Sequence, residues 1–542
     1  MKKLLVLVLA LALLLVTSAS ALTVAPAGTY PIVDEPVTLK VLAMMRSNYE
    51  DLPNNEMTKR FEALTNVHIE WEWVTGQDAI ATKFATSVAS GDYPDIYWGF
   101  ALEPSQIMLY ANQGVFVAID DMIDDCMPNF AAMLEADPTI KTAITAPDDH
   151  IYSLARTDAG LHMITPNKLY INTDWLEMAG MEMPETTEEF EEYLVYVRDH
   201  DMNGDGDTTD EIPMAGSAED CGGFTMLPTF WLLSSWELQP ATRLNVGEGG
   251  QLYFSAATDA YKEGLKWVKH LCDEGLYAKD SFTMNLSQLT SLTSDPEHLN
   301  VGASVGFVGT VFFGFKGLDA DTSAHMRDIY ASVLPVASET GRRLTTGYDT
   351  NCELNTFVSS ACENVEVALK WMDYWFSTEG TIESMYGWEN EQYEWVNEPA
   401  INGDPVSLKP YVLDADDPNK VGNATWNGAA ARYDTQYTRY CETANPKSGS
   451  FDYYRDSVGY LNFFPETWLP QTIWFTNEQA SELGLIDAIL MDYVAQAEAE
   501  FITGKRDIDA DWDAYLAELE GIGLEHYIAI YQEAYDTILA NK

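Results

Sequence analysis

Apolar and polar positions follow the periods of strands and helices in turn along the first part of the chain. Residues 37–44 form a β-branched, apolar run that is typical of a buried strand, and strict alternation over residues 69–74 predicts a second strand. Residues 56–64 and 79–89 carry apolar side chains at helical spacing, and a third strand is predicted to begin at Ile96. This β-α-β-α-β order predicts an α/β fold with a parallel sheet, in which ligands gather beyond the carboxyl ends of the strands.

Helical patterns with clear ends recur further along the chain. The Thr-Thr-Glu-Glu group at residues 186–189 precedes an apolar periodic run and predicts the start of a helix. Amphipathic helices are predicted to begin at Tyr261 and at Val365. The roughly 520 residues that follow residue 21 exceed the size at which a single core stops growing, so we expect at least two domains.

Several of these segments match a known protein family. The matching residues are Ser90-Gly91-Asp92-Tyr93-Pro94-Asp95-Ile96, Leu169–Leu176, Glu500–Asp509, Trp512, Tyr515 and Tyr531–Asp536. In this combination the chain resembles the extracellular solute-binding proteins (family 1) that feed ABC importers, in particular the oligosaccharide-binding branch. The resemblance implies a periplasmic-binding-protein-like fold of two lobes joined by a hinge, with the ligand held in a cleft between the lobes.

The resemblance also implies that the chain crosses between the lobes more than once. We expect residues 37–160 in lobe 1, with a later segment near 330–400. Residues 161–329 are expected in lobe 2, with a later segment near 401–542. Residues 22–36 contain several prolines with little periodicity, and we expect them to form a flexible leader.

The N-terminus has the pattern of a secretory signal peptide. Two lysines precede an apolar run from Leu4 to Val16, and small residues follow up to Ala21, after which we expect cleavage. An uncleaved anchor is the alternative. The first cysteine is Cys126, so no cysteine stands at the end of the signal to accept a lipid. We therefore expect an extracytoplasmic protein that is periplasmic, at the cell surface or secreted.

The charge of the chain limits its partners. The formal net charge is −55, with 85 acidic residues against 30 basic ones, and such a surface repels nucleic acids and anionic membranes. It also disfavours strongly anionic ligands, so we expect a neutral oligosaccharide. Six cysteines are too few for a disulfide framework in this length, and both a Cys352–Cys362 bridge and free buried thiols stay open.

An acidic, glycine-containing loop is the strongest local motif. Oxygen-bearing side chains recur at alternate positions and match a calcium-binding loop, with the ligands Asp201, Asn203, Asp205, Asp207 and Glu211. A second register that starts at Asp199 and closes at Asp210 also fits, and we prefer the first because some family members have a similar loop that ends in Asp-Glu-Ile-Pro. We expect structural Ca²⁺, and an empty acidic turn is the alternative.

Aromatic residues are the candidates for contact with sugar. The chain has 15 tryptophans and 29 tyrosines, and aromatic rings stack on the flat faces of sugars. Tryptophans at apolar helical positions, such as Trp267 and Trp371, are expected to be core residues. The candidate ligand-binding residues lie in predicted loops or at element ends: Arg46, Asn48, Trp98, Arg156, Trp231, Trp236, Tyr348, Asp349, Trp388 and Trp426.

No motif supports catalysis. Gly302-Ala303-Ser304-Val305-Gly306 fits a nucleophile elbow, but the elbow requires a strand followed by a helix, and the flanking residues favour extended chain. The eight histidines form no zinc-binding motif. We expect a non-enzymatic, monomeric receptor that delivers its ligand to a membrane permease. The alternatives are a secreted glycoside hydrolase, because acidic pairs are abundant, and a peptide-binding or sensor protein of the same fold.

Overall fold

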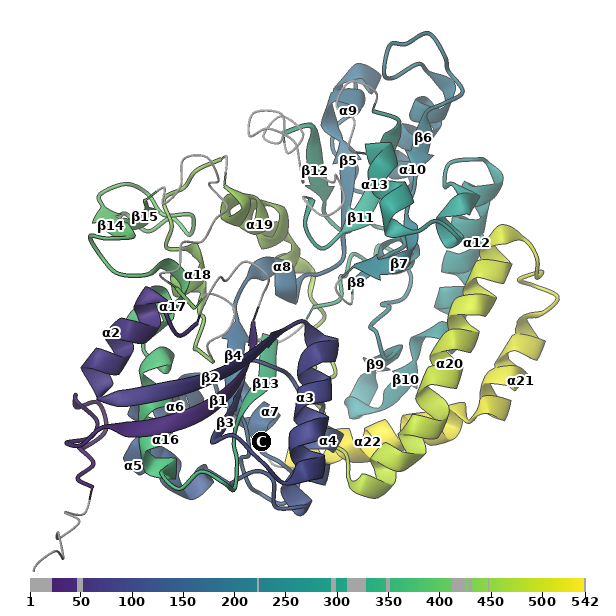
Figure 1. Ribbon diagram of the computed structural model, residues 1–542. Coiled ribbons are helices and arrows are strands. Elements are labelled where there is room, and N and C mark those ends of the chain that lie inside the picture. The colour runs from purple at the N-terminus through teal and green to yellow at the C-terminus, as the bar shows by residue number, and fades with distance from the viewer. Residues whose placement is uncertain are drawn as a thin grey trace, which may run out of the picture.

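The computed structural model describes residues 22–45, 52–221, 224–293, 299–309, 328–347, 351–411, 425–426, 431–446 and 448–540. These residues form two lobes, each built around its own β-sheet (Figure 1). The predicted α/β fold with two lobes is confirmed. The expected signal peptide and the candidates Arg46, Asn48, Tyr348 and Asp349 lie outside the described residues.

Lobe 1 is built on a five-stranded sheet in the order β2-β1-β3-β13-β4. Its strands are β1 (Val37–Met45), β2 (Val67–Thr75), β3 (Ile96–Trp98), β4 (Leu154–Asp158) and β13 (Asn351–Val358). As predicted, β1 runs parallel to both β2 and β3. The later strand β13 inserts antiparallel between β3 and β4, so β4 runs in the same direction as β1.

Lobe 2 is built on a four-stranded sheet in the order β12-β5-β11-β6. Its strands are β5 (Lys168–Asn172), β6 (Ile212–Met214), β11 (Val301–Gly306) and β12 (Tyr330–Val333). Both β11 and β12 pair antiparallel with β5. Three hairpins stand outside the two sheets: β7–β8 (Ser217–Cys221, Phe224–Met226), β9–β10 (Leu244–Val246, Leu252–Phe254) and β14–β15 (Tyr393–Val396, Ser407–Pro410).

Helices cover the two sheets. Those of lobe 1 are α2 (Glu56–Thr65), α3 (Gln77–Ser90), α4 (Pro104–Asn112), α5 (Ile123–Cys126), α6 (Pro128–Ala136), α7 (Pro138–Ile144), α16 (Val365–Asp373) and α17 (Thr378–Tyr386). Those of lobe 2 are α9 (Thr173–Ala179), α10 (Thr187–Asp199), α11 (Thr229–Leu233), α12 (Asp259–Asp273), α13 (Leu286–Thr293), α20 (Asn477–Thr503), α21 (Trp512–Ile522) and α22 (Leu524–Ala540). Between the lobes lie α8 (Leu161–Ile164), α18 (Gln436–Tyr440) and α19 (Gly449–Val458), as Figure 1 shows.

The capping box that the sequence predicts at the start of α10 is present. The Thr186 hydroxyl accepts from the backbone N–H of Glu189 at 3.2 Å, and the Glu189 carboxylate accepts in return from the N–H of Thr186 at 3.2 Å. Two backbone donors that the first turn of the helix leaves unpaired are thereby satisfied. The local pattern alone therefore fixes where this helix begins.

Each lobe has its own hydrophobic core. One buried cluster joins the strands of the first sheet to α2, α6 and α16, and a separate cluster joins the second sheet to α10, α12 and the C-terminal helices. Two separate cores are what a chain of this length needs, because a single core stops growing well below this size. All six cysteines are free thiols, so Cys352 and Cys362 form no bridge. In the part of the chain described here, no helix has the length and apolar character to cross a membrane.

In the part of the chain that the structure describes, three segments connect the lobes, and we name them by order. The first crossing (159–167) joins β4 to β5, the second (334–350) joins β12 to β13, and the third (464–476) leads to α20. The later segment of lobe 1 expected near 330–400 includes β12, but β12 pairs with β5, so the return to lobe 1 follows Val333. The expected lobe 2 segment near 401–542 begins with residues that pack on lobe 1, because Leu408 shares a cluster with Ile382 of α17.

Candidate functional site

Strand ends of both sheets lie next to the first crossing. In lobe 1 the carboxyl ends of β1, β3 and β4 lie at one edge, because these strands run in the same direction. In lobe 2 the end of β11 lies beside the start of β5, where Gly306 pairs with Lys168. Only residues 159–167 separate the end of β4 from the start of β5, so these two edges are neighbours. The interlobe site is defined here as the side chains at these edges.

A group of charged side chains, most of them buried, lies at the lobe 1 edge. Arg156 of β4 is only 6% exposed and pairs with Glu353 of β13, with 2.9 Å between its Nη1 and Glu353 Oε2. Its Nη2 lies 3.8 Å from the carboxylate of Asp158, the last residue of β4. Residues on adjacent antiparallel strands face each other here, since Glu353 is the register partner of Arg156.

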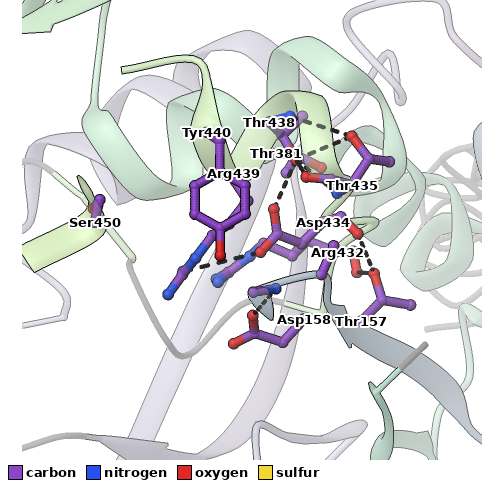
Figure 2. Close-up of polar contacts among 12 residues, drawn as sticks. Thr157, Asp158, Thr381, Arg432, Asp434, Thr435, Thr438, Arg439, Tyr440 and Ser450 are labelled. Atoms are coloured by element: carbon purple, nitrogen blue, oxygen red, sulfur yellow. Dashed lines mark hydrogen bonds and ion pairs between the residues drawn. The ribbon is translucent and has the colours of Figure 1, made fainter. Parts of the chain in front are cut away.

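A later segment adds three more charged residues to this group (Figure 2). Thr157 of β4 donates from its backbone N–H to the carbonyl of Arg432 at 3.0 Å, and from its hydroxyl to the carbonyl of Asp434 at 3.0 Å. Arg439 of α18 lies 4.0 Å from Asp434. The junction charge cluster therefore comprises Arg156, Asp158, Glu353, Arg432, Asp434 and Arg439, with the positive and negative side chains in equal number.

Burial and charge determine how these groups ionise. Burial alone would raise the pKa of Asp158, but Arg439, Arg156 and Arg432 together hold it well below its usual range. Burial raises the pKa of Asp434, against the opposing effect of Arg432 and Arg439. Burial also lowers the pKa of Arg432 to about 10, so its guanidinium is still charged at neutral pH. The cluster is thus close to neutral as a whole although it is built from charges.

Three hydrogen-bond donors of the junction charge cluster have no acceptor among the described residues. Arg432 is 1% exposed, yet its Nε and Nη1 have no acceptor among the residues that the structure describes. The Nε of Arg156 is also buried without an acceptor there. Buried N–H groups are almost always paired, so these three donors call for an acceptor that comes from outside the described residues.

Aromatic rings lie on the lobe 2 side of the first crossing. His162 of α8 stacks on Tyr453 of α19 at 4.4 Å between ring centroids. The rings of Phe307 and Phe224 lie 4.9 Å apart and are tilted against each other. Burial lowers the pKa of His162 to about 3, so its ring is neutral at pH 7. Phe224, Phe307 and Tyr453 are half-buried and expose part of their rings. Such surfaces can stack on a sugar while the charged groups opposite supply hydrogen bonds.

Comparison with known proteins agrees with this architecture. The sequence profile of the bacterial extracellular solute-binding proteins matches residues 50–211. Over 536 residues, the chain is 28% identical to the fructooligosaccharide ABC transporter substrate-binding protein FusA of Streptococcus pneumoniae, which covers 95% of this chain and 93% of FusA. The chain is therefore similar to the bacterial extracellular solute-binding proteins over residues 50–211 and to FusA over most of its length.

Solved structures agree with the fold of this protein. A FusA EF-hand mutant in complex with fructo-nystose matches 93% of this chain and 100% of that chain, with a TM-score of 0.72 and 25% identity. A solute-binding protein of Bifidobacterium longum infantis, described as HMO-binding and associated with an ABC transporter, matches 93% and 99% of the two chains, with a TM-score of 0.78 and 22% identity. The polygalacturonan/rhamnogalacturonan-binding protein YtcQ of Bacillus subtilis is 26% identical over 51% of each chain.

The predicted ligand residues of this protein are distributed over several places. Arg156 belongs to the junction charge cluster. Trp98 is 3% exposed and lies in an aromatic cluster of lobe 1, stacked on Trp71 at 5.2 Å. Trp426 is buried in the same cluster, and its indole N–H donates to the Thr58 hydroxyl at 3.0 Å. Trp98 ends β3 at the edge of the sheet where a ligand is expected, but its ring is buried in the core of lobe 1.

The other described candidates have protein neighbours of their own. Trp231 is buried in lobe 2, where its indole N–H donates to the hydroxyl of Tyr460 at 3.3 Å. Trp236 packs against Trp267 with 5.0 Å between ring centroids. Trp388 is half-buried, with the Arg60 guanidinium 5.3 Å above its ring. Contact between these rings and a ligand stays a prediction.

The proposed calcium ligands lie in a tight, turn-rich loop before β6. Both carboxylate oxygens of Asp201 accept backbone N–H groups, from Gly204 at 2.6 Å and from Gly206 at 2.9 Å. Glu211 Oε1 accepts from the N–H of Met202 at 2.7 Å, whereas its Oε2 is buried and has no donor among the residues that the structure describes. Asp199 is engaged elsewhere, because Arg198 Nε donates to it at 2.8 Å. Within the described residues, no three acidic, histidine or cysteine side chains converge into a metal-binding group.

Proposed function

We propose that this protein captures a neutral oligosaccharide between its lobes and delivers it to the membrane permease of an ABC importer. The observation that carries the proposal is the match to FusA over almost the full length of both chains, since FusA is a fructooligosaccharide-binding component of such a transporter. The family is extracellular, which agrees with a receptor that works outside the cytoplasm. We further propose that residues 1–21 are removed as a signal peptide and that the protein acts as a monomer without chemistry of its own.

The chemistry of the interlobe site supports a polar, uncharged ligand. Unpaired N–H groups of Arg156 and Arg432 can donate to sugar hydroxyls, and the half-buried rings of Phe224, Phe307 and Tyr453 can stack on sugar faces. The charges of the junction cluster already balance one another, so a charged ligand would leave an uncompensated charge in a buried place. Contacts with both lobes would then favour closure, because a ligand shifts a conformational equilibrium by its preference for one state.

Thermal unfolding against a panel of oligosaccharides tests the proposal. The panel contains kestose and nystose, other neutral oligosaccharides, galacturonate oligomers and peptides. A ligand at about 100 times its dissociation constant adds about 2.7 kcal/mol, which raises the midpoint by about 2 to 3 °C in a chain of this length. We expect this shift with a neutral oligosaccharide that is recovered intact.

A variant and a matched control locate the binding. Phe307→Ala is expected to remove most of the shift, whereas Tyr411→Ala, at an exposed aromatic outside the interlobe site, is expected to keep it. A shift with galacturonate oligomers alone would replace the neutral sugar by an acidic one, and a shift with peptides alone would make the protein a peptide receptor. Recovery of shortened sugar would show a hydrolase.

We also propose that Ca²⁺ binds in the loop from Asp201 to Glu211 and stabilises lobe 2. Carboxylate and amide oxygens at alternate positions suit a hard cation. The buried Oε2 of Glu211, at the closing position, has no donor in the described part of the chain and could serve as a ligand atom. The register that begins at Asp201 is supported because Asp199 is held by Arg198. One of the similar structures is described as an EF-hand mutant of FusA, which points to such a loop in that protein.

Chelation is expected to destabilise the calcium-loaded protein. Calcium at about ten times its dissociation constant adds about 1.4 kcal/mol, so EDTA should lower the unfolding midpoint by about 1 to 2 °C, and added Ca²⁺ should restore it. Glu211→Gln should lose this response, and Asp199→Asn should keep it. An unchanged midpoint with EDTA, in protein whose calcium content was first measured, would remove the proposal.

A further inference from the structure

A pocket of about 290 Å³ lies where lobe 2 meets two of the crossings. Its wall is formed by the β9–β10 hairpin and the loop before it, by the second crossing, and by residues 465–471 of the third crossing. The two crossings touch here, because a Cβ on Gly347 would lie 2.4 Å from the ring of Phe464. None of the lining residues belongs to the junction charge cluster, so this pocket is a separate feature of the molecule.

The buried carboxylate of Glu237 holds the polar side chains of the pocket in place. Glu237 Oε1 accepts from Asn245 Nδ2 at 3.0 Å and from the Tyr253 hydroxyl at 3.0 Å, and it lies 3.3 Å from Arg342 Nη2. Arg342 Nη1 also donates to the carbonyl of Trp236 at 2.9 Å. The Arg342 Nε is buried without an acceptor in the described part of the chain. Glu237 therefore holds the lining side chains of Asn245, Tyr253 and Arg342 in place, and Arg342 compensates its negative charge.

The opposite side of the pocket is aromatic. Trp468 is half-buried and lies between Pro465 and Pro470, whose rings restrict the backbone on either side of it. Phe464 lies 5.9 Å from the Trp468 ring, so the indole is also supported by a neighbouring ring. An indole held in this way offers a flat apolar face at low entropic cost. The pocket thus has a stacking surface on one side and hydrogen-bonding groups on the other.

We infer that this pocket binds a single neutral sugar ring, with Trp468 as the stacking surface and Asn245, Tyr253 and Arg342 as hydrogen-bond partners. The volume is at the lower end for ligand pockets and suits one ring rather than a chain. A neutral ring is favoured because the Arg342–Glu237 pair leaves no net charge for an ionic ligand to neutralise. The inference goes beyond the proposed function, since it concerns a second site that could be occupied whatever ligand the interlobe site takes.

Ligand-observed saturation-transfer NMR on the full-length mature protein tests this inference. The probes are the methyl glycosides of fructose, glucose and galactose, with glucuronate as the charged comparison. We expect saturable transfer to at least one neutral glycoside and none to glucuronate. Trp468→Ala should weaken that binding by at least about tenfold, Trp468→Phe should retain most of it, and the exposed Trp73→Ala should leave it unchanged.

Comparison with the interlobe variant assigns the signal to one site. Transfer that survives in Phe307→Ala and is lost in Trp468→Ala supports the inference, even if no oligosaccharide is found to bind between the lobes. Transfer that is lost in Phe307→Ala and survives in Trp468→Ala would overturn it, as would the absence of transfer to every neutral glycoside. The thermal midpoint of each variant shows that it is folded, and Trp468→Phe provides the comparison if Trp468→Ala is not.

Discussion

Replacing Asp158 with asparagine is expected to lower the free energy of unfolding by about 3 kcal/mol at pH 7. The carboxylate ends β4, is buried, and faces Arg156, Arg432 and Arg439. Asparagine keeps the shape of the side chain but removes the charge, so the three guanidinium groups lose part of their compensation in a place that water does not reach. Urea unfolding followed by circular dichroism measures the loss.

The same substitution is expected to change the response to acid. The arginines hold the pKa of Asp158 in the folded protein below its unfolded value of about 3.9. The contribution of Asp158 is therefore complete above the unfolded pKa and is lost as the pH falls through the folded value. The difference between wild type and Asp158→Asn should stay constant from pH 8 to pH 5 and shrink below about pH 4.

An exposed aspartate provides the control for this prediction. Asp492 lies on the solvent side of α20, and Asp492→Asn should change the stability by less than about 0.5 kcal/mol. A loss below about 1 kcal/mol for Asp158→Asn would mean that water screens the junction charge cluster, as it does at the surface. A loss of the expected size that did not change with acid would assign the effect to packing instead.

The first half of lobe 1 could be predicted from local pattern. In β1 the apolar run at residues 37–44 is buried at alternate positions up to Lys40 and at every position from Val41 to Ala43. The alternation from Ile69 reflects burial of one face of β2, and the structure pairs the two strands in parallel. The place of β13 could not be predicted in this way. Its partners β3 and β4 are about 260 and about 200 residues away, and nothing in residues 351–358 indicates which strands they pair with.

The candidate site was predicted at the level of loops rather than side chains. Arg156, one of the predicted ligand residues, lies in the junction charge cluster. Arg432, Asp434 and Arg439 could not be identified, since charged residues in a segment without periodicity resemble a solvated surface. The fold buries Arg432 and Asp434 and partly buries Arg439. The half-buried Phe224 and Phe307 could not be identified either, because no motif marks them and only their position beside the first crossing distinguishes them.

A tryptophan at the end of an element is not necessarily accessible to a ligand. Trp98 ends β3 at the edge where ligands gather, but a strand directs alternate side chains to opposite faces, and this one enters the core. Trp426 is similarly enclosed by Trp98, Trp371 and Trp375. Trp468 was not selected, although it lies in a pocket between two prolines. Flanking prolines in an otherwise irregular segment are the signal that could have indicated it.

Replacing Glu498 with glutamine is expected to lower the free energy of unfolding by about 3 kcal/mol, because it leaves Arg243 buried without a counter-charge. Both side chains are 4% exposed, and Arg243 Nη2 lies 3.2 Å from Glu498 Oε2. The Tyr261 hydroxyl of α12 donates to the same oxygen at 2.7 Å. This pair connects the C-terminal helix α20 to the segment that leads into β9, so its loss should loosen the helices that close lobe 2.

A double substitution separates the ion pair from the packing around it. Arg243→Met alone should cost about as much as Glu498→Gln, whereas Arg243→Met with Glu498→Met should be closer to wild type, because no unpaired charge remains buried. Glu520→Gln, at an exposed position of α21, serves as the matched control and should change stability by less than about 0.5 kcal/mol. The double variant could instead lose as much free energy of unfolding as the two single variants combined. That result would mean that the pair contributes through packing alone and that its charges do not stabilise the fold.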